Sequence, residues 1–230
     1  MTVGFRVLPR TRAVSSDIAQ RFSALPVANV SDSMSRMTAG GARLRPYHER
    51  GLRLVGPALT VKSRPGDNLM VHKAIDIAEP GDVIVVDAGG DLSNAIIGDI
   101  MTTMAKRREI AGFVINGAIR DVDDIREKAG MPVFAAGVTH RGPYKDGPGE
   151  INVPVAIDGM VVEPGDLIIG DGDGILCVPL AMAESILAAA EAKQAAEQRE
   201  FSQIADGTYD RSWVDETLRK RGCEFASEGA

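Results

Sequence analysis

The stretch GDIMTTMAKRREIAGFVINGAIRDVDD, residues 98–124, places a glycine-led helical pattern, an apolar run and then charged side chains in immediate succession. AGFVINGAI has the composition of a buried strand. Arg120 and Asp121 follow it directly. Charged side chains beside a strand core cost several kcal/mol unless they are paired or bound to something. Their position at the end of the strand therefore indicates a functional site.

The bulk composition excludes several classes of protein. The chain has 230 residues, 44% of them hydrophobic, which suffices for one large domain or one domain with an appendage. The net charge of -6 gives no basic surface for nucleic acid, and 4% aromatic residues disfavour base stacking. No run approaches ~20 apolar residues, no secretory signal pattern opens the chain, and two cysteines form no disulfide framework. We therefore expect a cytoplasmic protein without nucleic-acid or membrane partners.

The pattern predicts helices in the opening 40 residues, within SSDIAQRFSALP and VANVSDSMSRM. Short β-branched runs then alternate with helical segments, and strands follow one another from about residue 150 to 179. The expected strands lie within 53–63, 82–88, 112–119, 132–138, 151–158, 166–171 and 174–179. The expected helices lie within 67–78, 98–109 and 120–130, with a long helix within 179–207 and a short one around Trp213 before a disordered end. This order predicts an α/β domain with more than one sheet layer.

A short internal repeat links EPGDVIVVDAGGD at 79–91 with EPGDLIIGDGDGI at 163–175. A Pro-Gly turn leading into a buried strand explains it, because such turns recur for backbone reasons alone. The alternative is that both copies deliver their terminal Asp and Gly residues to one rim of the sheet.

The glycine before the helical pattern of 98–109 predicts an anion site. Gly98 or Asn94 could cap this helix, whose apolar positions share a face: Ile100, Met101, Met104 and Ala105. Free backbone N–H groups and the helix dipole at such an entry favour a bound carboxylate or phosphate. The sequence matches neither the dinucleotide-binding glycine pattern nor a phosphate-binding loop.

Arg120 and the acids around it suggest chemistry. Asp121, Asp123 and Asp124 suit the N-terminal dipole of a helix, so a capped helix is the plainer explanation of them. The Arg120 guanidinium offers a fixed fork for a carboxylate or keto oxygen. Mg²⁺ needs only one or two protein carboxylates, and Asp121 and Asp99 can supply them.

The histidines add little to this pattern. His72 is expected to be an ordinary surface or packing residue of its helix, whereas His140 lies in a turn-rich loop that could cover a site or contact another subunit. No zinc-type His/Cys cluster and no Gly-x-Ser-x-Gly elbow are present.

Together, EPGDVIVVDAGG, residues 98–124, PVFAAGVTHRGP and INVPVAIDGMVVEPGDLIIGDGDGILCVP resemble the family that unites the regulator of ribonuclease activity A (RraA) with 4-hydroxy-4-methyl-2-oxoglutarate aldolases. The most specific element is Asp99, twenty residues, then Arg120-Asp121. The sequence predicts a single domain over residues 1–230. The resemblance covers its core, about residues 25–207, and residues 208–230 form a C-terminal tail. It implies a swivelling β/β/α domain with N-terminal helices and a long C-terminal helix, assembled as a homotrimer or hexamer.

The resemblance also implies roles for individual residues. Asp121 would hold Mg²⁺ or Mn²⁺ directly, Arg120 would contact the pyruvyl oxygen, and Asp99 would orient metal-bound water. The helix entry at Gly98, with the N–H groups of Ile100 and Met101, would take the pyruvate carboxylate. An acid from the C-terminal helix of a neighbouring subunit is expected near the metal through water, and we choose Glu197 among Glu191, Glu197 and Glu200.

The implied activity is a metal-dependent class II pyruvate aldolase acting on a 4-hydroxy-2-oxo acid, with oxaloacetate decarboxylation as a side activity. Lys145 or Arg141 could meet a distal carboxylate of the substrate, although a solvated loop is the favoured role for both. The alternative is a non-catalytic regulator that binds and inhibits a ribonuclease. Some members are labelled demethylmenaquinone methyltransferases, but the chain has no glycine-rich methyl-donor motif with a ribose-binding acid.

Overall fold

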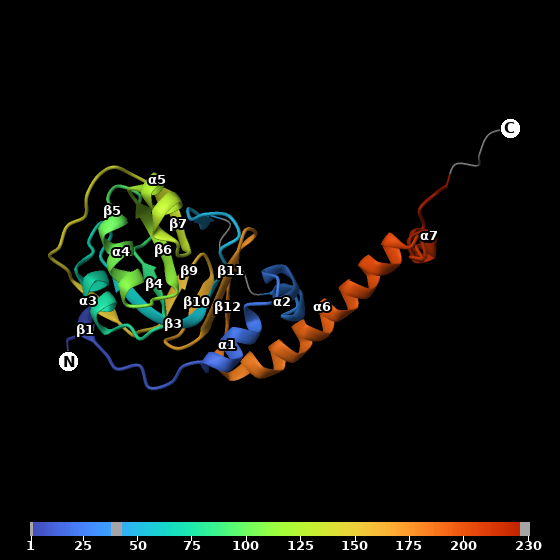
Figure 1. Ribbon diagram of the computed structural model, residues 1–230, viewed down its shortest axis with the longest axis horizontal. Helices are drawn as coiled ribbons and strands as arrows, with labels where there is room; N and C mark the ends of the chain where they lie inside the picture. Colours follow the sequence, from blue (N-terminus) through green and yellow to red (C-terminus); the bar gives the residue numbers. More distant parts are fainter. Residues whose placement is uncertain (1, 38–42, 226–230) are drawn as a thin grey trace. The chain divides into compact units, whose positions relative to one another are not determined.

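The computed structural model describes residues 2–37 and 43–225. They fall into two compact units, Met1–Glu191 and Ala192–Ala230. In the first unit the main sheet has the strand order β1-β8-β3-β4-β6-β7-β2, with β11 and β12 attached through β3 and with β5 beside β6 (Figure 1). These strands are β1 (Phe5–Val7), β2 (Arg45–Pro46), β3 (Leu54–Ser63), β4 (Val83–Asp87), β5 (Ala95–Ile97), β6 (Gly112–Ile119), β7 (Val133–Val138), β8 (Gly149–Ile151), β11 (Leu167–Asp171) and β12 (Gly174–Val178).

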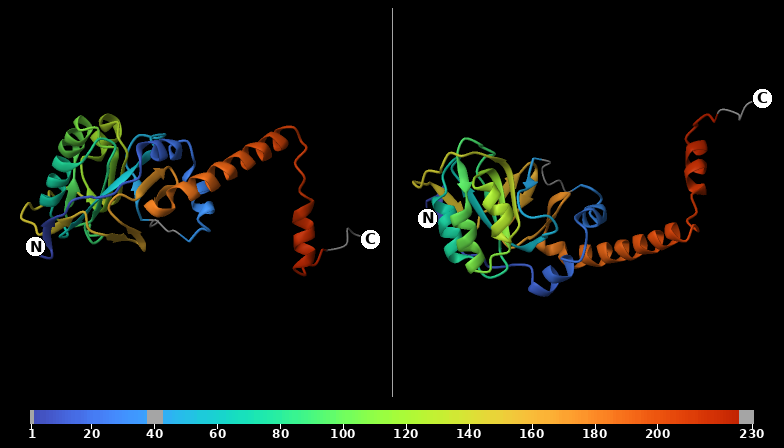
Figure 2. Two further views of the ribbon diagram at one scale, coloured as in Figure 1. Left: turned by 90° about the horizontal axis from the view of Figure 1, so that it is seen from below. Right: turned by 45° about the horizontal axis from the view of Figure 1, so that its top comes forward.

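One face of the main sheet is covered by helices. They are α3 (Leu69–Ile77), α4 (Asp99–Arg107), the single turn α5 (Val122–Asp124) and the π-helical turn Ile125–Ala129 that continues it. Figure 2 shows the α3 and α4 helices on this face from two further sides. Their apolar side chains form one buried cluster with the inward-facing residues of β3, β4 and β6.

The opposite face of the sheet is covered by β-structure. The hairpin of β9 (Val155–Ile157) and β10 (Met160–Val162) packs with β11 and β12 against residues of β3, β4 and β6, including Val83, Val85 and Val114. All three of these valines are fully buried, as expected for parallel strands enclosed on both faces. The predicted mixed α/β fold with a second β layer is thus confirmed.

The two N-terminal helices form a third cluster. Helix α1 (Ser16–Phe22) begins at Ser15, whose side chain accepts a hydrogen bond from Ile18 N, and α2 (Val27–Ser33) follows. Both pack with β11, β12 and the start of α6 (Ala183–Ala205). The predicted helices are confirmed, but the opening segment is not wholly helical, because β1 pairs in parallel with β8. Residues 38–42 lie outside the described part of the chain.

Other elements differ from the sequence prediction in their boundaries. The strand expected over 151–158 is divided between β8 and β9, because Asn152 adopts a left-handed backbone with φ 57°. The helix expected over 120–130 is one α-turn followed by a π-helical turn. A 3-10 turn, Leu180–Met182, precedes α6.

The internal repeat is a repeated turn. Asp82 accepts a hydrogen bond from Glu79 N, and Asp166 accepts one from Glu163 N, each at 2.9 Å. Strand β4 runs parallel to β3, but β11 runs antiparallel to it, so the two copies end toward opposite ends of β3. The turn explanation is confirmed, and the alternative of one shared rim is wrong.

The second unit holds the remainder of α6 and α7 (Ser212–Lys220). The short helix predicted around Trp213 is therefore confirmed. Arg219 lies 5.0 Å above the centre of the Phe225 ring, within the range of a cation–π contact. The predicted disordered end concerns residues 226–230, outside the described residues. Within the described ranges, no helix combines the length and hydrophobicity needed to cross a membrane.

Candidate active site

The register of β6 brings two distant segments together. Its first five residues pair with β4, but after an irregularity Ala118 and Ile119 pair with β5 instead. Both β5 and β6 run parallel, so the residues that follow them meet at one edge. Arg120 N donates to Ile97 O at 3.0 Å across this edge. Gly98 and Asp99, which begin α4, thereby lie beside Arg120 and Asp121.

Gly98 allows the closest approach within this group. It is the N-cap of α4, as predicted, and its backbone is extended with φ -151°. A Cβ atom at this position would lie 2.3 Å from Asp121 Oδ2 and 3.0 Å from Arg120 Cγ. A side chain at position 98 would therefore displace the side chains of Asp121 and Arg120.

Asp121 is held by its backbone and by α4. It adopts a left-handed conformation with φ 57° at the N-cap of α5, which Asp tolerates better than most residues. Its Oδ2 accepts a hydrogen bond from Asp99 N at 3.1 Å. The unusual backbone turns the carboxylate toward α4 rather than leaving it on its own short helix, and such strain is typical of functional positions.

Arg120 lies against the same carboxylate. Its Nε is 3.5 Å from Asp121 Oδ2, and the two side chains are 40% and 38% exposed. A Cβ atom on Gly142 would lie 3.1 Å from Arg120 Nη1, so the loop that follows β7 also contacts the guanidinium. A cation and a carboxylate that both remain open to solvent can be approached by a ligand.

A pocket of about 160 Å³ lies at this edge of the sheet. Its lining consists of Asn68, His72, Ile96, Ile97, Gly98, Ile100, Met101, Arg120, Asp121, Pro143 and Lys145. A second hollow of about 430 Å³ shares Arg120 and Asp121 and includes His140. Larger hollows lie elsewhere: one of about 530 Å³ is found around residues 9–12, and another lies near His48. Neither is lined by Arg120 or Asp121.

The anion site predicted at the start of α4 is available in part. Met101 N donates to Gly98 O at 3.1 Å, whereas Ile100 N has no hydrogen-bond acceptor among the described residues. Of the four apolar positions named for α4, Met101 and Ala105 are buried, whereas Ile100 is 71% exposed and Met104 is 39% exposed. Thr102 is buried as well.

The acidic groups fit a hard divalent cation. Among residues 2–37 and 43–225 no group of three or more His, Cys, Asp or Glu side chains could hold a metal ion. Mg²⁺, however, usually keeps several waters and binds through one or two carboxylates. Asp121, half-exposed in a pocket with its oxygen over Gly98, meets that requirement, and Asp99 is adjacent through its N–H. We therefore name Asp121 as the residue that would hold such an ion directly, and the role of Asp99 through water stays a prediction.

Lys128 lies close to the carboxylates of Asp124 and Asp99. Its ammonium group bonds to Asp124, which raises the pKa of Lys128, and Asp99 contributes further to this rise. Asp99 thus has a positive neighbour on the turn that follows α5. Asp124 serves this local ion pair, and no side chain in the described ranges caps α5 through a hydrogen bond.

Two pocket residues received no such role from the sequence. His72 was expected to be ordinary, but it lines the pocket, and burial followed by the charge of Lys145 lowers its pKa. Asn68 is 2% exposed and donates to Ile96 O at 2.9 Å, while its Oδ1 has no partner among the described residues. Asp67 and Asn68 open the helical segment expected within 67–78, and this Asp-Asn pair was the signal that could have pointed to Asn68.

Glu197 lies in the second unit. It is on α6, where its Oε1 is 3.1 Å from Lys193 Nζ. Its predicted contribution to a neighbouring subunit's metal site stays a prediction. Glu191 belongs to the first unit and forms a two-pronged pair with Arg21.

Comparison with known proteins shows the family of this chain. The family model RraA-like, described as Aldolase/RraA, matches residues 27–177. A protein of Halalkalibacterium halodurans, provisionally named a 4-hydroxy-4-methyl-2-oxoglutarate aldolase, is 42% identical over 190 residues, which is 83% of this chain and 90% of that protein.

Two solved structures are similar over most of the chain. An uncharacterised protein from Pseudomonas syringae has 30% identity and a TM-score of 0.76, covering 85% of this chain and 95% of its own. RraAS2 of Streptomyces coelicolor, described as an unusual member of the RNase ES inhibitor RraA family, has 27% identity and a TM-score of 0.74, covering 85% and 100%. The chain therefore belongs to the RraA-like family.

Proposed function

We propose that this protein is a divalent-metal-dependent pyruvate aldolase that cleaves a 4-hydroxy-2-oxo acid of the 4-hydroxy-4-methyl-2-oxoglutarate type. In this reaction the C4 hydroxyl loses its proton and the C3–C4 bond breaks. The bonding electron pair passes to the pyruvyl part as an enolate, and C4 becomes the carbonyl of the second oxo acid. Protonation of C3 then yields pyruvate.

One observation carries the proposal. Arg120 and Asp121 meet the N-terminus of α4 so closely that a side chain at position 98 would displace the Asp121 carboxylate. This places a cation, a carboxylate and a helix N-terminus around one pocket. A 2-oxo acid has a carboxylate and a neighbouring oxygen that gains charge in the reaction, and these groups correspond to that arrangement.

Each residue has a distinct role in the proposal. The Arg120 guanidinium stabilises the negative charge that develops on the enolate oxygen, and it is already oriented before the substrate binds. The first turn of α4, with the free Ile100 N–H, receives the pyruvyl carboxylate. A divalent ion held by Asp121, with Asp99 beside it, supplies Lewis acidity and alignment of the oxo acid.

Oxaloacetate decarboxylation follows from the same stabilisation. Loss of CO₂ from oxaloacetate leaves the same enolate, so Arg120 would stabilise it in the same way. We expect this side activity to share the metal requirement.

The test compares variants in a pyruvate-release assay with Mg²⁺ or Mn²⁺. Asp121→Asn keeps the shape of the side chain but weakens metal binding, so we expect release to fall by at least about 100-fold, with a normal melting temperature. Asp17→Asn makes the same chemical change on exposed α1 and should behave as wild type. Full activity of Asp121→Asn with normal metal affinity would contradict the proposal.

We further propose a homo-oligomer, either a trimer or a hexamer. Exposed apolar side chains lie near the pocket, among them Ile100, Val138 and Leu92, which is consistent with cover by a second subunit. Light scattering coupled to size-exclusion chromatography gives the mass directly. Two free cysteines fit the reducing cytoplasm that we expect as the compartment.

A ribonuclease regulator is the alternative, and the likeness to RraAS2 of the RNase ES inhibitor family favours it. The chain's acidic balance could suit a basic partner surface. Arg120 and Asp121 in one pocket, with the backbone N–H of Asp99 bonded to Asp121, favour chemistry instead. Tight ribonuclease binding in a pull-down, together with no turnover of any oxo acid, would support the regulator.

A further inference from the structure

The loop from Thr139 to Pro148 passes over the candidate pocket and contributes Pro143 and Lys145 to its lining. It contains no helix and only one isolated β-bridge residue, Tyr144. A loop of this kind holds a side chain in place only if other groups fix its backbone. The groups that fix it come from two segments distant in sequence.

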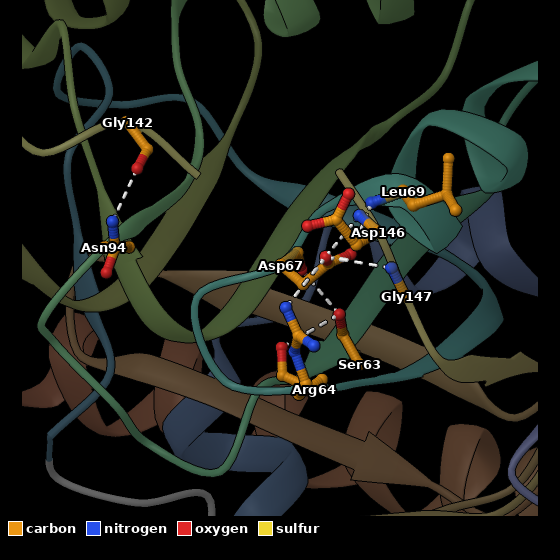
Figure 3. Close-up of polar contacts among 8 residues, drawn as sticks. All are labelled: Ser63, Arg64, Asp67, Leu69, Asn94, Gly142, Asp146 and Gly147. Carbon is orange, nitrogen blue, oxygen red and sulfur yellow. Dashed lines mark hydrogen bonds and ion pairs between the residues drawn. The ribbon is translucent and has the colours of Figure 1, made fainter. Parts of the chain in front are cut away.

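The buried carboxylate of Asp67 is the principal anchor (Figure 3). Asp67 has no exposed surface. Its Oδ2 accepts hydrogen bonds from Asp146 N at 2.7 Å and Gly147 N at 2.9 Å, and its Oδ1 accepts one from Leu69 N at 2.9 Å. The two loop donors directly follow Lys145 in the chain. Arg64 Nη2 lies 3.5 Å from the same Oδ2.

Further contacts fix the loop before Lys145. Asn94 Nδ2 donates to Gly142 O at 2.6 Å, as Figure 3 also shows. Tyr144 N donates to Gly66 O at 2.9 Å, and Asn68 N donates to Tyr144 O at 3.0 Å. Lys145 is thus held on both sides through its backbone neighbours.

The Lys145 side chain is exposed and forms no ion pair with any residue in the described ranges. Its charge nevertheless acts within the pocket, because it lowers the pKa of His72, after the larger effect of burial. The pocket therefore carries two cationic side chains, Arg120 and Lys145, and Arg120 already has Asp121 as its partner. An unpaired ammonium group beside such a site can receive a second anionic group of the ligand.

We propose that Asp67 is a positioning residue, which fixes the 139–148 loop so that the Lys145 ammonium group meets the carboxylate on the non-pyruvyl half of the substrate. This inference rests on the proposed aldolase function. It replaces the solvated role that the sequence favoured for Lys145. It makes Lys145 a determinant of specificity for substrates with a distal carboxylate.

A carboxylate is needed at position 67 because all its partners are donors. Asparagine would turn an NH₂ group toward either Leu69 N or the two loop N–H groups. The Asp67→Asn variant therefore releases part of the loop and leaves Lys145 unchanged. Asn94→Ala removes the Gly142 contact and provides a milder variant should Asp67→Asn fold poorly.

The experiment compares two substrates that differ at the distal group, 4-hydroxy-4-methyl-2-oxoglutarate and 4-hydroxy-2-oxopentanoate. Lys145→Met should lower kcat/KM for the first relative to the second by about tenfold or more, mainly through KM. Asp67→Asn and Asn94→Ala should each lower this ratio of kcat/KM values. In the Asp67→Asn/Lys145→Met double variant, the ratio should be no lower than in Lys145→Met alone.

The matched control is Asp166→Asn. Asp166 is also a buried carboxylate that accepts two backbone N–H bonds, from Glu163 and Leu180, but it does not line the candidate pocket. The control should leave the substrate ratio unchanged. An equal loss on both substrates in Asp67→Asn, or the same change of ratio in Asp166→Asn, would overturn the positioning role.

A second readout does not depend on activity. The chain has three histidines, so NMR can follow the His72 imidazole. Lys145→Met should raise the pKa of His72, and Asp67→Asn should raise it in the same direction because the ammonium group moves away. A rise in the lysine variant with no change in Asp67→Asn would overturn the inference. Cleavage of neither substrate by the wild type would reject the proposed function, and this titration would still decide whether Asp67 positions Lys145.

Discussion

Replacement of Gly98 by alanine should disable the site while leaving the fold nearly intact. The new Cβ would lie 2.3 Å from Asp121 Oδ2, whereas ordinary contact begins at 3.4 Å, so the carboxylate must move by about 1.1 Å. Asp121 is 38% exposed and can rotate into solvent. The backbone is not strained, because φ at Gly98 is -151°. The cost in stability should therefore stay within about 1 kcal/mol.

The cost in activity should be much larger. A misplacement of ~1 Å in a catalytic constellation commonly lowers the rate about 100-fold, which corresponds to about 2.7 kcal/mol of transition-state free energy. The alanine also lies 3.2 Å from Arg120 Nε, so both charged groups are affected. We expect kcat for pyruvate release to fall about 100-fold and the Kd for Mn²⁺ to rise.

The assay is steady-state pyruvate release, with Mn²⁺ titration calorimetry and thermal unfolding on the same samples. Gly172→Ala is the matched control, because a Cβ there meets nothing within 4 Å and the backbone is not left-handed. It should match wild type in all three measurements. A Gly98→Ala enzyme with wild-type kcat and wild-type Mn²⁺ affinity would refute the inferred close packing of the site.

Three further predictions concern charge. Arg120→Ala should lower kcat by a factor of about 10² to 10³. Arg120→Lys should keep part of this activity, because an ammonium group carries the charge but cannot reproduce the guanidinium fork. An equal loss of kcat in both variants would argue against a simple charge role. Burial and the nearby lysine lower the pKa of His72, so the unfolded chain binds more protons between pH 6.5 and the lowered pKa, and stability falls as the pH drops across this window. Urea unfolding of His72→Gln should lack this part of the loss. Arg10 pairs at 2.6 Å with the carboxylate of Asp82, which is only 1% exposed, so Arg10→Met should lower the free energy of unfolding by about 3 kcal/mol or more. Arg36 forms an exposed pair with Asp32, so Arg36→Met should lower it by less than about 1 kcal/mol. Similar melting temperatures for the two variants would contradict this difference.

The sequence predicted the regular elements well where hydrophobic pattern and turn residues agreed. The strand expected over 112–119 has those bounds in the structure, and Gly98 caps its helix as expected. Both features depend on local composition. Among the described residues, four short strands, β1, β2, β5 and β10, were not foreseen, because two or three residues are too few to show a period.

The candidate site was predictable as a set of residue types but not as a geometry. Arg120 and Asp121 after an apolar run indicated a site at the end of a strand, and their spacing from Asp99 was the most specific element of the family resemblance. The register change in β6 that makes them neighbours depends on which strand is paired, which the local pattern does not specify. The exposure of Ile100 was missed because helical period alone does not tell a core face from a surface open to a partner.

The anchoring of the 139–148 loop was also beyond the sequence. Asp67 and Asp146 are far apart in the chain, and a carboxylate that accepts distant backbone N–H bonds leaves no spacing pattern. Lys145 therefore looked like a solvated loop residue. The expectation that this turn-rich loop could cover a site is confirmed, since Pro143 and Lys145 line the pocket.

The most direct test of the central claim is lactate-dehydrogenase-coupled detection of pyruvate from 4-hydroxy-4-methyl-2-oxoglutarate and from oxaloacetate, with Mg²⁺ or Mn²⁺ and then with EDTA. Spontaneous decarboxylation of oxaloacetate is subtracted with an Asp121→Asn blank. We predict pyruvate release well above this blank, its loss in EDTA and its return when the metal is restored. Protein that binds the metal but yields no pyruvate above the blank from either substrate would contradict the account.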